Sequence, residues 1–493
     1  MDSVNIEKIQ LDHHQIKAYD ELIKLYNSSF VVINTGCPGW GKTVWMLYFA
    51  VNYNYTLLVI CPKNVELQWH EEAARFGAKI ITISYSMIGG KSNKINHPYL
   101  SIHNGQYMVT NEFIQLLSTR IVLVFDEAQE IKNPKSQRSE ACQILSKEIV
   151  RINNGSRIAI LSNTPFDKEI FVESIIKIMG IVTTKLLFFY NVGIKDYQID
   201  GYGYKQFIDY CSIINPSLTK KLIPHKLKSS TIKKSIYEMY VQIIKPKLVV
   251  STPDFKISSK FIPKIKYYKL DPISLEKFNK GINDLKNAIH YADDGTFKYT
   301  NDNIGKDIVA YEIMENAKVE IFIKNALDIL NYSKYAKLII YVWHDSTVNI
   351  LIDSLRHFNP LRCDGKVDPI TRFKYRQLFN LPTTEYRLII AKPTAFGQGI
   401  SLHDTNGNFP RYTIINPNFS YIKIKQSAGR TYRVGSKSDS YCILAYARDT
   451  DEERIINALI KKDKIVQQIV YIDPEDENIN SIPFPSDWPI EYE

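Results

Sequence analysis

The sequence predicts two tandem α/β lobes, each built on a parallel β-sheet with helices on both faces. Short runs of β-branched and aliphatic residues occur in the first third of the chain and again in the last third. Each run ends in a polar or glycine-rich turn, and the intervals between the runs can hold helices. Strands of a parallel sheet are buried on both faces, so they read as continuous apolar runs. Their alternation with helices is typical of a doubly wound sheet.

The first lobe is expected over residues 1–175 and the second over 311–472, with helices such as those at 68–76 and 347–358 between the strands. Residues 176–310 are expected to form a linker with helical insertions and a basic stretch at 219–235, and 473–493 an acidic, proline-rich tail, extended or disordered. The predicted strands are FVVINT (30–35), TLLVICP (56–62), RIVLVFDE (120–127), RIAILSNTP (157–165), KLIIYVWHD (337–345), YRLIIAKPT (386–394), RYTIINPN (411–418) and SYCILAYA (440–447).

Composition indicates a folded protein and does not by itself identify its partner. The chain has 493 residues, of which 45% are hydrophobic and 23% charged, so we expect folded domains rather than disorder. The net charge of +10 suits a polyanionic partner, although charge alone does not identify one. Six cysteines without CxxC pairs predict free thiols. No membrane-spanning run or signal peptide is evident, so we expect an intracellular, cytoplasmic protein without a membrane partner.

A glycine-rich segment directly after the first strand predicts a phosphate-binding loop. Residues 36–43 read GCPGWGKT, a full match to G-x-x-x-x-G-K-[ST]. The alternative is a glycine-rich turn without a ligand, but the loop follows a strand and precedes a helix, as phosphate binding requires. Lys42 is expected on the β- and γ-phosphates of ATP, and Thr43 on Mg²⁺. The predicted ATP-binding residues of this loop are Gly36, Gly39, Gly41, Lys42 and Thr43.

Two adjacent carboxylates end a second apolar strand, in LVFDEAQEIKN (123–133). In nucleotide hydrolysis such a pair has two tasks: Asp126 is expected to hold Mg²⁺, and Glu127 to orient and activate the attacking water. The alternative is an acidic turn that caps a helix. The phosphate loop upstream favours hydrolysis.

These motifs resemble those of superfamily two helicases and translocases, in which DEAQ is a form of the DEAD/DEAH box. Within that superfamily the chain is most similar to the Swi/Snf-like translocases, although IKPKL (244–248) replaces their paired arginines and GQGISL replaces G-x-G-I-N-L. The other matching segments are IEKIQLDHHQIKAYDEL (6–22), CPKNVELQWHEE (61–72), MVTNEFI (108–114), LSNTP (161–165), KLIIYVWHD (337–345), RCDGKVDPITR (362–372), KPTAFGQGISL (392–402) and QSAGRTYRVGS (426–436).

The resemblance implies two RecA-like lobes with ATP at their interface and nucleic acid across both. It implies arginine fingers at Arg430 and Arg433, one helical turn apart, and coupling of nucleotide state to nucleic acid through Ser162 and Thr164. Lone tryptophans such as Trp69 and Trp343 either stack on bases or pack in the core. The resemblance assigns further ATP contacts to Gln15, which would contact adenine, and to Gly399 and Gln426. It assigns nucleic-acid contacts to Lys63, Thr110, Ser162, Thr394 and the basic stretch around Lys220 to Lys234. For these threonines helix capping is the open alternative, and for the lysine run a solvated face.

The function that follows is an ATP- and Mg²⁺-dependent DNA helicase or translocase acting in transcription, replication or repair. Two alternatives stay open: a helicase that acts on RNA, and an ATP-gated nucleic-acid-binding scaffold that unwinds nothing. DNA is favoured over RNA as the partner, and transcription or replication machinery is a candidate partner. A large DNA virus or phage is a plausible source, in which case the protein could be packaged in the virion.

Overall fold

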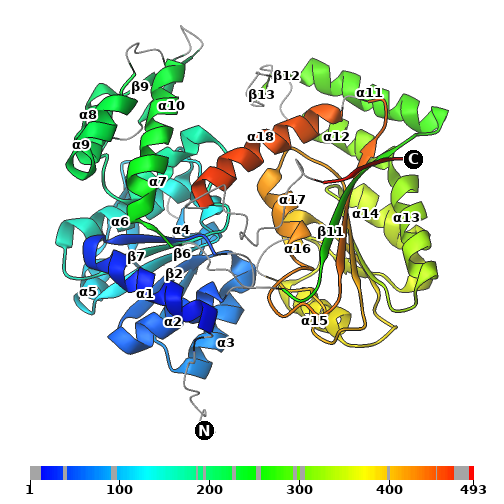
Figure 1. The fold of residues 1–493 in the computed structure, drawn as a ribbon, viewed down its shortest axis with the longest axis horizontal. Helices are drawn as coiled ribbons and strands as arrows, with labels where there is room; N and C mark the ends of the chain where they lie inside the picture. The colour runs from blue at the N-terminus through cyan, green and yellow to red at the C-terminus, as the bar shows by residue number, and fades with distance from the viewer. Residues whose placement is uncertain are drawn as a thin grey trace. The chain divides into compact units, whose positions relative to one another are not determined.

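The chain divides into two compact units in the computed structural model (Figure 1). The first unit comprises Met1–Phe255 with Lys464–Ile479, and the second comprises Lys256–Asp463 with Asn480–Glu493. The structure describes residues 11, 13–36, 41–89, 97–184, 187–191, 196–224, 229–250, 257–291, 297–299, 306–396, 400–450, 452–470 and 488–493.

The first unit is built on a parallel sheet with strand order β10-β1-β7-β6-β2-β3. It contains all four strands predicted for the first lobe, and two more that the sequence reading missed. The strands are β1 (Val31–Asn34), β2 (Thr56–Cys61), β3 (Ile80–Ser84), β6 (Ile121–Asp126), β7 (Arg157–Leu161) and β10 (Val249–Val250).

Alternate residues of these strands bury two separate cores, one on each face of the sheet. Val32 packs on one face with α1 (His13–Ser28), α2 (Lys42–Tyr53) and α3 (Glu66–Phe76). Its neighbours Val31 and Ile33 pack on the other face with four more helices. Burial on both faces explains why these strands are continuously apolar. The helices of the second face are α4 (Tyr85–Ile88), α5 (Asn111–Ser118), α6 (Gln137–Ile152) and α7 (Val172–Ile178).

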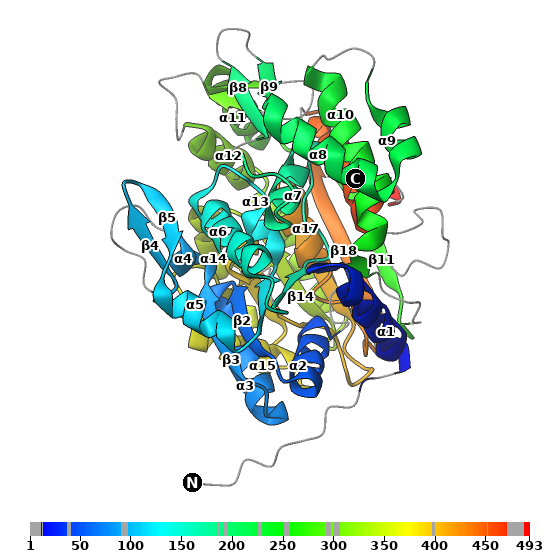
Figure 2. The same ribbon diagram turned by 90° about the vertical axis from the view of Figure 1, so that its left-hand side faces the viewer.

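A helical insertion precedes β10. It gathers at one end of the first unit, as Figures 1 and 2 both show, and it lies within the stretch 176–310, where helical insertions are expected. Part of the predicted basic stretch lies on it, whereas 225–228 lie outside the described residues. Its elements are the hairpin β8 (Phe188–Asn191) and β9 (Asp196–Ile199), and the helices α8 (Gly201–Ile214), α9 (Pro216–Leu222) and α10 (Ser229–Met239), which a π-helical turn (Tyr240–Ile244) extends.

The second unit is also built on a parallel sheet, with strand order β15-β16-β14-β17-β18-β11-β19. The predicted class, two α/β units that each contain a parallel sheet, is therefore confirmed. Its strands are β11 (Phe261–Tyr268), β14 (Lys337–Tyr341), β15 (Leu361–Cys363), β16 (Leu388–Ala391), β17 (Arg411–Ile415), β18 (Ser440–Ala447) and β19 (Ile490–Tyr492), and its helices are α11 (Pro272–Ala288), α12 (Lys306–Asn316), α13 (Val319–Tyr332), α14 (Asp345–Ser354), α15 (Pro369–Asn380), α16 (Pro393–Phe396) and α17 (Tyr421–Ala428).

The boundaries of the two units in the structure differ from those predicted from the sequence. The predicted linker, 176–310, is divided between the units, because its β11 pairs in parallel with β18 of the second unit. Helix α18 (Glu453–Val470) contains the boundary at 463/464, which the reading placed inside one lobe. Strand β11 was missed because its sequence, FIPKIKYY, contains a proline and two lysines, and the partner strand that makes it a strand lies 179 positions away.

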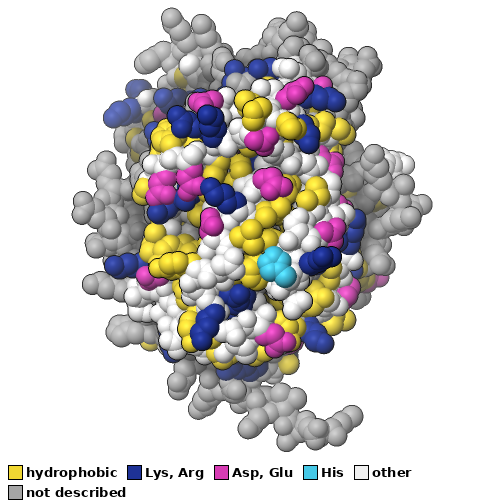
Figure 3. Space-filling view, turned by 90° about the vertical axis from the view of Figure 1, so that its right-hand side faces the viewer, with side chains coloured by type: hydrophobic (Ala, Val, Ile, Leu, Met, Phe, Trp, Pro, Cys, Tyr) yellow, Lys and Arg dark blue, Asp and Glu magenta, His cyan; other side chains and the backbone are white. Residues whose placement is uncertain are grey.

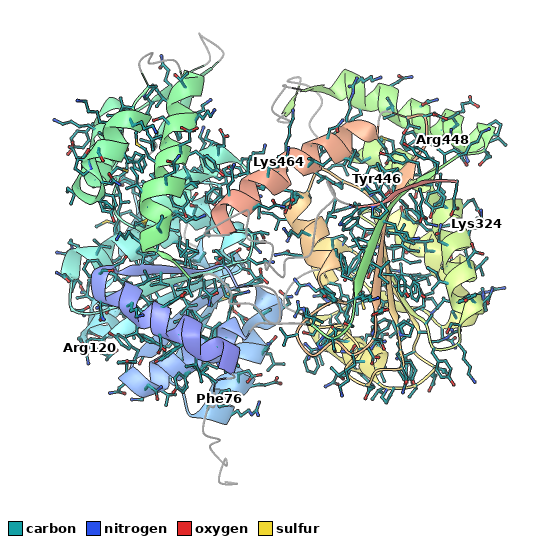
Figure 4. The ribbon with its side chains drawn as sticks, in the orientation of Figure 1. Phe76, Arg120, Lys324, Tyr446, Arg448 and Lys464 are labelled. Atoms are coloured by element: carbon teal, nitrogen blue, oxygen red, sulfur yellow. The ribbon has the colours of Figure 1, made fainter. Side chains whose placement is uncertain are left out.

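Part of the predicted tail is an edge strand of the second unit. Strand β19 pairs with β11, Glu491 forms an ion pair of 2.5 Å with Lys264, and the ring of Tyr492 stacks on Tyr267. Arg448, labelled in Figure 4, lies 5.5 Å from the centre of the Tyr492 ring. Residues 471–487 lie outside the described part of the chain.

The structure also bears on the cysteines, on membrane-spanning helices and on the charges of the surface. Cys61, Cys142, Cys211, Cys363 and Cys442 are buried free thiols, as predicted, and Cys37 lies outside the described residues. Within the described ranges, every helix is too short or too polar to cross a membrane. Figure 3 shows acidic and basic side chains interspersed over the face that it presents.

Helices α11 and α12 approach each other closely at Gly281. A Cβ atom there would lie 2.7 Å from Met314 Cγ and 2.9 Å from the backbone oxygen of Ala310. Gly281→Ala is therefore expected to destabilise the protein by about 1–3 kcal/mol despite the better helix propensity of alanine. Denaturant unfolding measures this, with Gly201→Ala as the control, because a Cβ at Gly201 meets nothing within 4 Å. Unchanged stability of Gly281→Ala would contradict the packing.

Candidate functional site

Three neighbouring strands of the first unit end at the same level. Asn34 of β1 pairs with Leu161 of β7, which pairs with Asp126 of β6. Parallel strands lie about 4.8 Å apart and all their carboxyl ends point the same way. The backbone ladder therefore brings the phosphate loop, the DEAQ segment and the LSNTP segment to one edge of the sheet, where α/β proteins bind ligands.

The phosphate loop joins β1 to α2, which begins at Lys42. Gly41, just before the helix, has φ of 85°, a conformation that glycine adopts without strain. The amine Nζ of Lys42 donates to the backbone oxygen of Gly36 at 2.6 Å, across the loop. The backbone N–H of Gly36 donates to Asn34 Oδ1 at 2.9 Å. Of the predicted loop residues, Gly39 lies outside the described part of the chain.

Gln15, the predicted adenine contact, lies against this loop. Its side chain is buried, and a Cβ atom on Gly41 would collide with its amide nitrogen. The prediction that Gln15 belongs to the ATP site is compatible with this position, while its contact with adenine stays a prediction. Glycine is needed at position 41 for two reasons, the positive φ and the close approach of Gln15.

The DEAQ carboxylates occupy a tight turn after β6. The backbone of Glu127 is left-handed, with φ of 53°, which is uncommon for a residue other than glycine, asparagine or aspartate. Asp126 Oδ1 accepts the N–H of Glu127 at 3.0 Å, and Oδ2 accepts the indole N–H of Trp69 at 2.9 Å. Burial, and then the negative charge of Glu127, raise the pKa of Asp126 to about 6. Two carboxylates in such a place favour a cation between or beside them.

A chain of hydrogen bonds joins Glu127 to the LSNTP segment. The amide Nε2 of Gln129 donates to Glu127 Oε2 at 2.8 Å, and its Oε1 accepts the hydroxyl of Ser162 at 2.6 Å. Ser162 Oγ in turn accepts the N–H of Thr164 at 3.1 Å. The backbone N–H of Ser162 donates to the backbone oxygen of Asn34, which starts the phosphate loop. Ser162 thus contacts the DEAQ segment through Gln129 and the end of β1 through Asn34, and Thr164 contacts Ser162, while their coupling role stays a prediction.

The residues at this edge fit a magnesium ion bound together with a nucleotide. The predicted ligands are hard oxygen donors, the hydroxyl of Thr43 in the first turn of α2 and the carboxylate of Asp126. Among the described residues no group of three or more His, Cys, Asp or Glu side chains could hold a metal by itself. Mg²⁺ commonly binds through one or two protein oxygens and substrate phosphates, so this donor set suits it.

The predicted arginine fingers lie in the second unit, immediately after α17. That helix ends at Ala428, so Arg430 and Arg433 are not one helical turn apart, as the sequence reading had them, but follow in an irregular turn. Both are almost completely buried. Arg430 donates to the backbone oxygen of Ile400 at 3.2 Å, and Arg433 to the hydroxyl of Ser401 at 2.7 Å.

Two other predicted ATP contacts belong to these segments. Gln426 is buried in the last turn of α17. Gly399, in the segment that the two arginines contact, lies outside the described residues. The structure thus joins the segments 392–402 and 426–436 through side-chain contacts.

Sequence reasoning missed Glu315, which organises the strand ends of the second unit. Its buried carboxylate accepts the backbone N–H groups of Trp343 and His344, each at 2.9 Å, and the amide Nδ2 of Asn416 at 2.6 Å. The indole of Trp343 donates to the backbone oxygen of Asn416, which binds the two strand ends together. A glutamate near the end of a helix carries no sequence signal of such a role.

The residues predicted to contact nucleic acid differ from one another in their exposure and in their hydrogen bonds. Lys63 and Thr394 are exposed. Thr110 caps α5 by accepting the N–H of Phe113 at 3.4 Å, and it donates to the backbone oxygen of Pro98 at 2.5 Å, so the capping alternative describes it well. Trp69 is buried against the sheet and therefore packs in the core instead of stacking on bases. In the basic stretch, Lys234 lies 3.7 Å from Glu238.

Comparison with known proteins shows a similarity that extends over most of the chain. No protein-family model matches the chain. Over 463 residues it is 22% identical to a protein named "Putative ATP-dependent RNA helicase L364" of Acanthamoeba polyphaga mimivirus, across 90% of this chain and 80% of that protein. The similarity to helicases that the motifs predict is thus confirmed along most of the chain. Among solved structures, the chain matches the Sulfolobus solfataricus SWI2/SNF2 ATPase core in complex with dsDNA, with 15% identity, coverage of 95% of this chain and 96% of that one, and a TM-score of 0.31.

Removal of the Glu315 carboxylate tests its structural role. Glu315→Ala leaves three N–H groups without their acceptor, so we expect a loss of about 1–3 kcal/mol of unfolding free energy. Denaturant unfolding measures the loss, and the exposed Glu320→Ala serves as the control. Equal stability of the two variants would show that water replaces the carboxylate.

Proposed function

We propose that the chain is a nucleic-acid-dependent ATPase, a helicase or translocase that couples ATP hydrolysis to movement on DNA. The observation that carries the proposal is the common edge of β1, β7 and β6, where Lys42, Glu127 and Ser162 follow three adjacent strand ends. A phosphate loop, a pair of carboxylates and a hydrogen-bonded link between them are the parts that phosphoryl transfer to water requires. The similarity to a protein named an ATP-dependent helicase supports this reading.

In this mechanism the residues of the phosphate loop and of the DEAQ segment each have a defined task. The N–H groups at the start of α2 and the amine of Lys42 bind the β- and γ-phosphates, so Lys42 exchanges the backbone oxygen of Gly36 for a phosphate oxygen. Thr43 and Asp126 would hold Mg²⁺, which neutralises charge on the phosphates when bound. Glu127 accepts a proton from the attacking water, and the amide of Gln129 keeps its carboxylate in one orientation.

The remaining tasks of the proposed mechanism fall to two arginines of the second unit and to nucleic-acid contacts from both units. Arg430 and Arg433 are assigned to the γ-phosphate by resemblance, and in that role they would exchange their contacts with Ile400 and Ser401 for phosphate oxygens. Phosphates of the nucleic acid are assigned to Lys63, Thr394 and the basic stretch around Lys220–Lys234. Such contacts read no base sequence, so the proposed motor acts on nucleic acid of any sequence.

DNA is the proposed partner because the motif set is most similar to that of Swi/Snf-like translocases. The mimivirus relative, by contrast, is named an RNA helicase. The proposed setting is transcription, replication or repair inside a cell, together with the corresponding machinery, and in a virion if the source is a virus.

Two substitutions test the ATP site. Lys42→Ala removes the phosphate-binding amine and Glu127→Gln removes the base, so each is expected to lower ATP turnover by at least about 100-fold. Circular dichroism should show an unchanged fold. Matched controls are Lys79→Ala and Glu112→Gln, which alter exposed residues and should leave turnover unchanged. Wild-type turnover in either site variant would contradict the assignment.

Turnover with different nucleic acids separates the proposal from its alternatives. We expect duplex or single-stranded DNA to stimulate the wild-type rate, with a steep loss of stimulation at high salt. Stimulation by RNA alone would identify an RNA-directed helicase instead. ATP turnover that no nucleic acid stimulates would reject the motor and favour the ATP-gated scaffold.

A further inference from the structure

Trp69 places a hydrogen-bond donor behind the DEAQ carboxylates. It belongs to α3, 57 positions before Asp126, and only 1% of its surface is exposed. Its indole Nε1 donates to Asp126 Oδ2 at 2.9 Å. An indole N–H in a protein core usually has a partner, but that partner need not be a carboxylate of the nucleotide site.

The contact removes the rotational freedom of Asp126. The terminal torsion of an aspartate is broad, so an unrestrained carboxylate samples many orientations about its last bond. Here Oδ1 accepts the N–H of Glu127 and Oδ2 accepts the indole, so both oxygens have a fixed donor. The donor ring cannot turn, because it is packed in the core formed by α2, α3 and the sheet.

Each carboxylate oxygen keeps acceptor capacity for a further partner, because an ionised carboxylate offers about four lone-pair sites. The two donors occupy one site on each oxygen and so select the direction in which the others point. Groups that hold a metal ligand in this way commonly change metal affinity by about 10- to 100-fold when they are removed.

We propose that Trp69 is a positioning residue that holds the Asp126 carboxylate in the orientation that binds the Mg²⁺ of the nucleotide. The inference rests on the proposed function and deepens it, because it adds to the magnesium site a residue that the motif reading assigned to base stacking or packing. A purely structural Trp69 would stabilise the fold without affecting how binding depends on Mg²⁺.

The test is Trp69→Phe in the full chain, which removes the N–H and keeps an aromatic ring. Binding of a fluorescent ADP analogue is measured with Mg²⁺ and with EDTA. We expect the affinity for Mg²⁺-ADP to fall about tenfold and the affinity for metal-free ADP to stay unchanged. The control is Trp343→Phe, which removes an indole donor to the backbone oxygen of Asn416 in the second unit.

A double-mutant cycle with Asp126→Asn separates positioning from packing. If Trp69 acts through the Asp126 carboxylate, Trp69→Phe should cause little additional loss of Mg²⁺-ADP affinity in the Asp126→Asn background. An equal loss in both backgrounds, or a Trp69→Phe variant with wild-type dependence on Mg²⁺, overturns the proposal.

A second measurement does not depend on the stability of Trp69→Phe. Indole-¹⁵N labelling reports the Nε1–H groups of the five tryptophans in the intact protein. At saturating ADP, addition of Mg²⁺ should move the indole signal of Trp69 in the wild type and leave that signal in place in Asp126→Asn. Wild-type ADP binding without a response of the Trp69 signal to Mg²⁺ overturns the role of Trp69 alone. Absence of nucleotide binding by the wild type overturns the proposed function and this inference with it.

Discussion

The hydrogen-bond register between β1, β7 and β6 is the constraint on which the candidate site depends. Asn34, Leu161 and Asp126 are paired across the ladder, so the residues that follow them must lie side by side. A slip of one residue in any of these strands would turn the buried side chains to the opposite face. The two apolar cores prevent such a slip, because they need alternate residues on opposite faces of the sheet. Packing on both faces therefore fixes the level at which the chemical groups appear.

Hydrogen bonds then fix the relative positions of the segments that the strand register brings together. Gln129 holds Glu127 and Ser162 at the same time, and the backbone of Ser162 reaches back to Asn34. A displacement of any of these segments would leave a buried donor or acceptor unsatisfied, which costs more than the bond itself contributes. The strained backbone of Glu127 belongs to the same arrangement, since strain of this kind persists where the surroundings over-determine the geometry.

In the second unit, buried polar contacts also hold separate segments together, but other residues make them. There Glu315 of α12, which no motif contains, joins the ends of β14 and β17, and Arg430 and Arg433 join the residues after α17 to the segment around Ser401. Both arginines are buried in these contacts, so a role at a phosphate requires them to exchange hydrogen-bond partners. The energetic cost of that exchange is small if the phosphate replaces neutral acceptors by charged ones.

The sequence by itself determined the fold class and eight of the strands, and it predicts the phosphate loop and the DEAQ pair, because each of these is encoded by neighbouring residues. Apolar runs mark strands buried on both faces, and phosphate binding needs glycine, lysine and threonine at fixed spacing. Only the tertiary structure decided that β11 and β19 belong to the second sheet, that Thr110 caps a helix, and that Trp69 donates to Asp126. These depend on partners up to 227 positions apart, and no local pattern records which partner a strand edge or an indole N–H will meet.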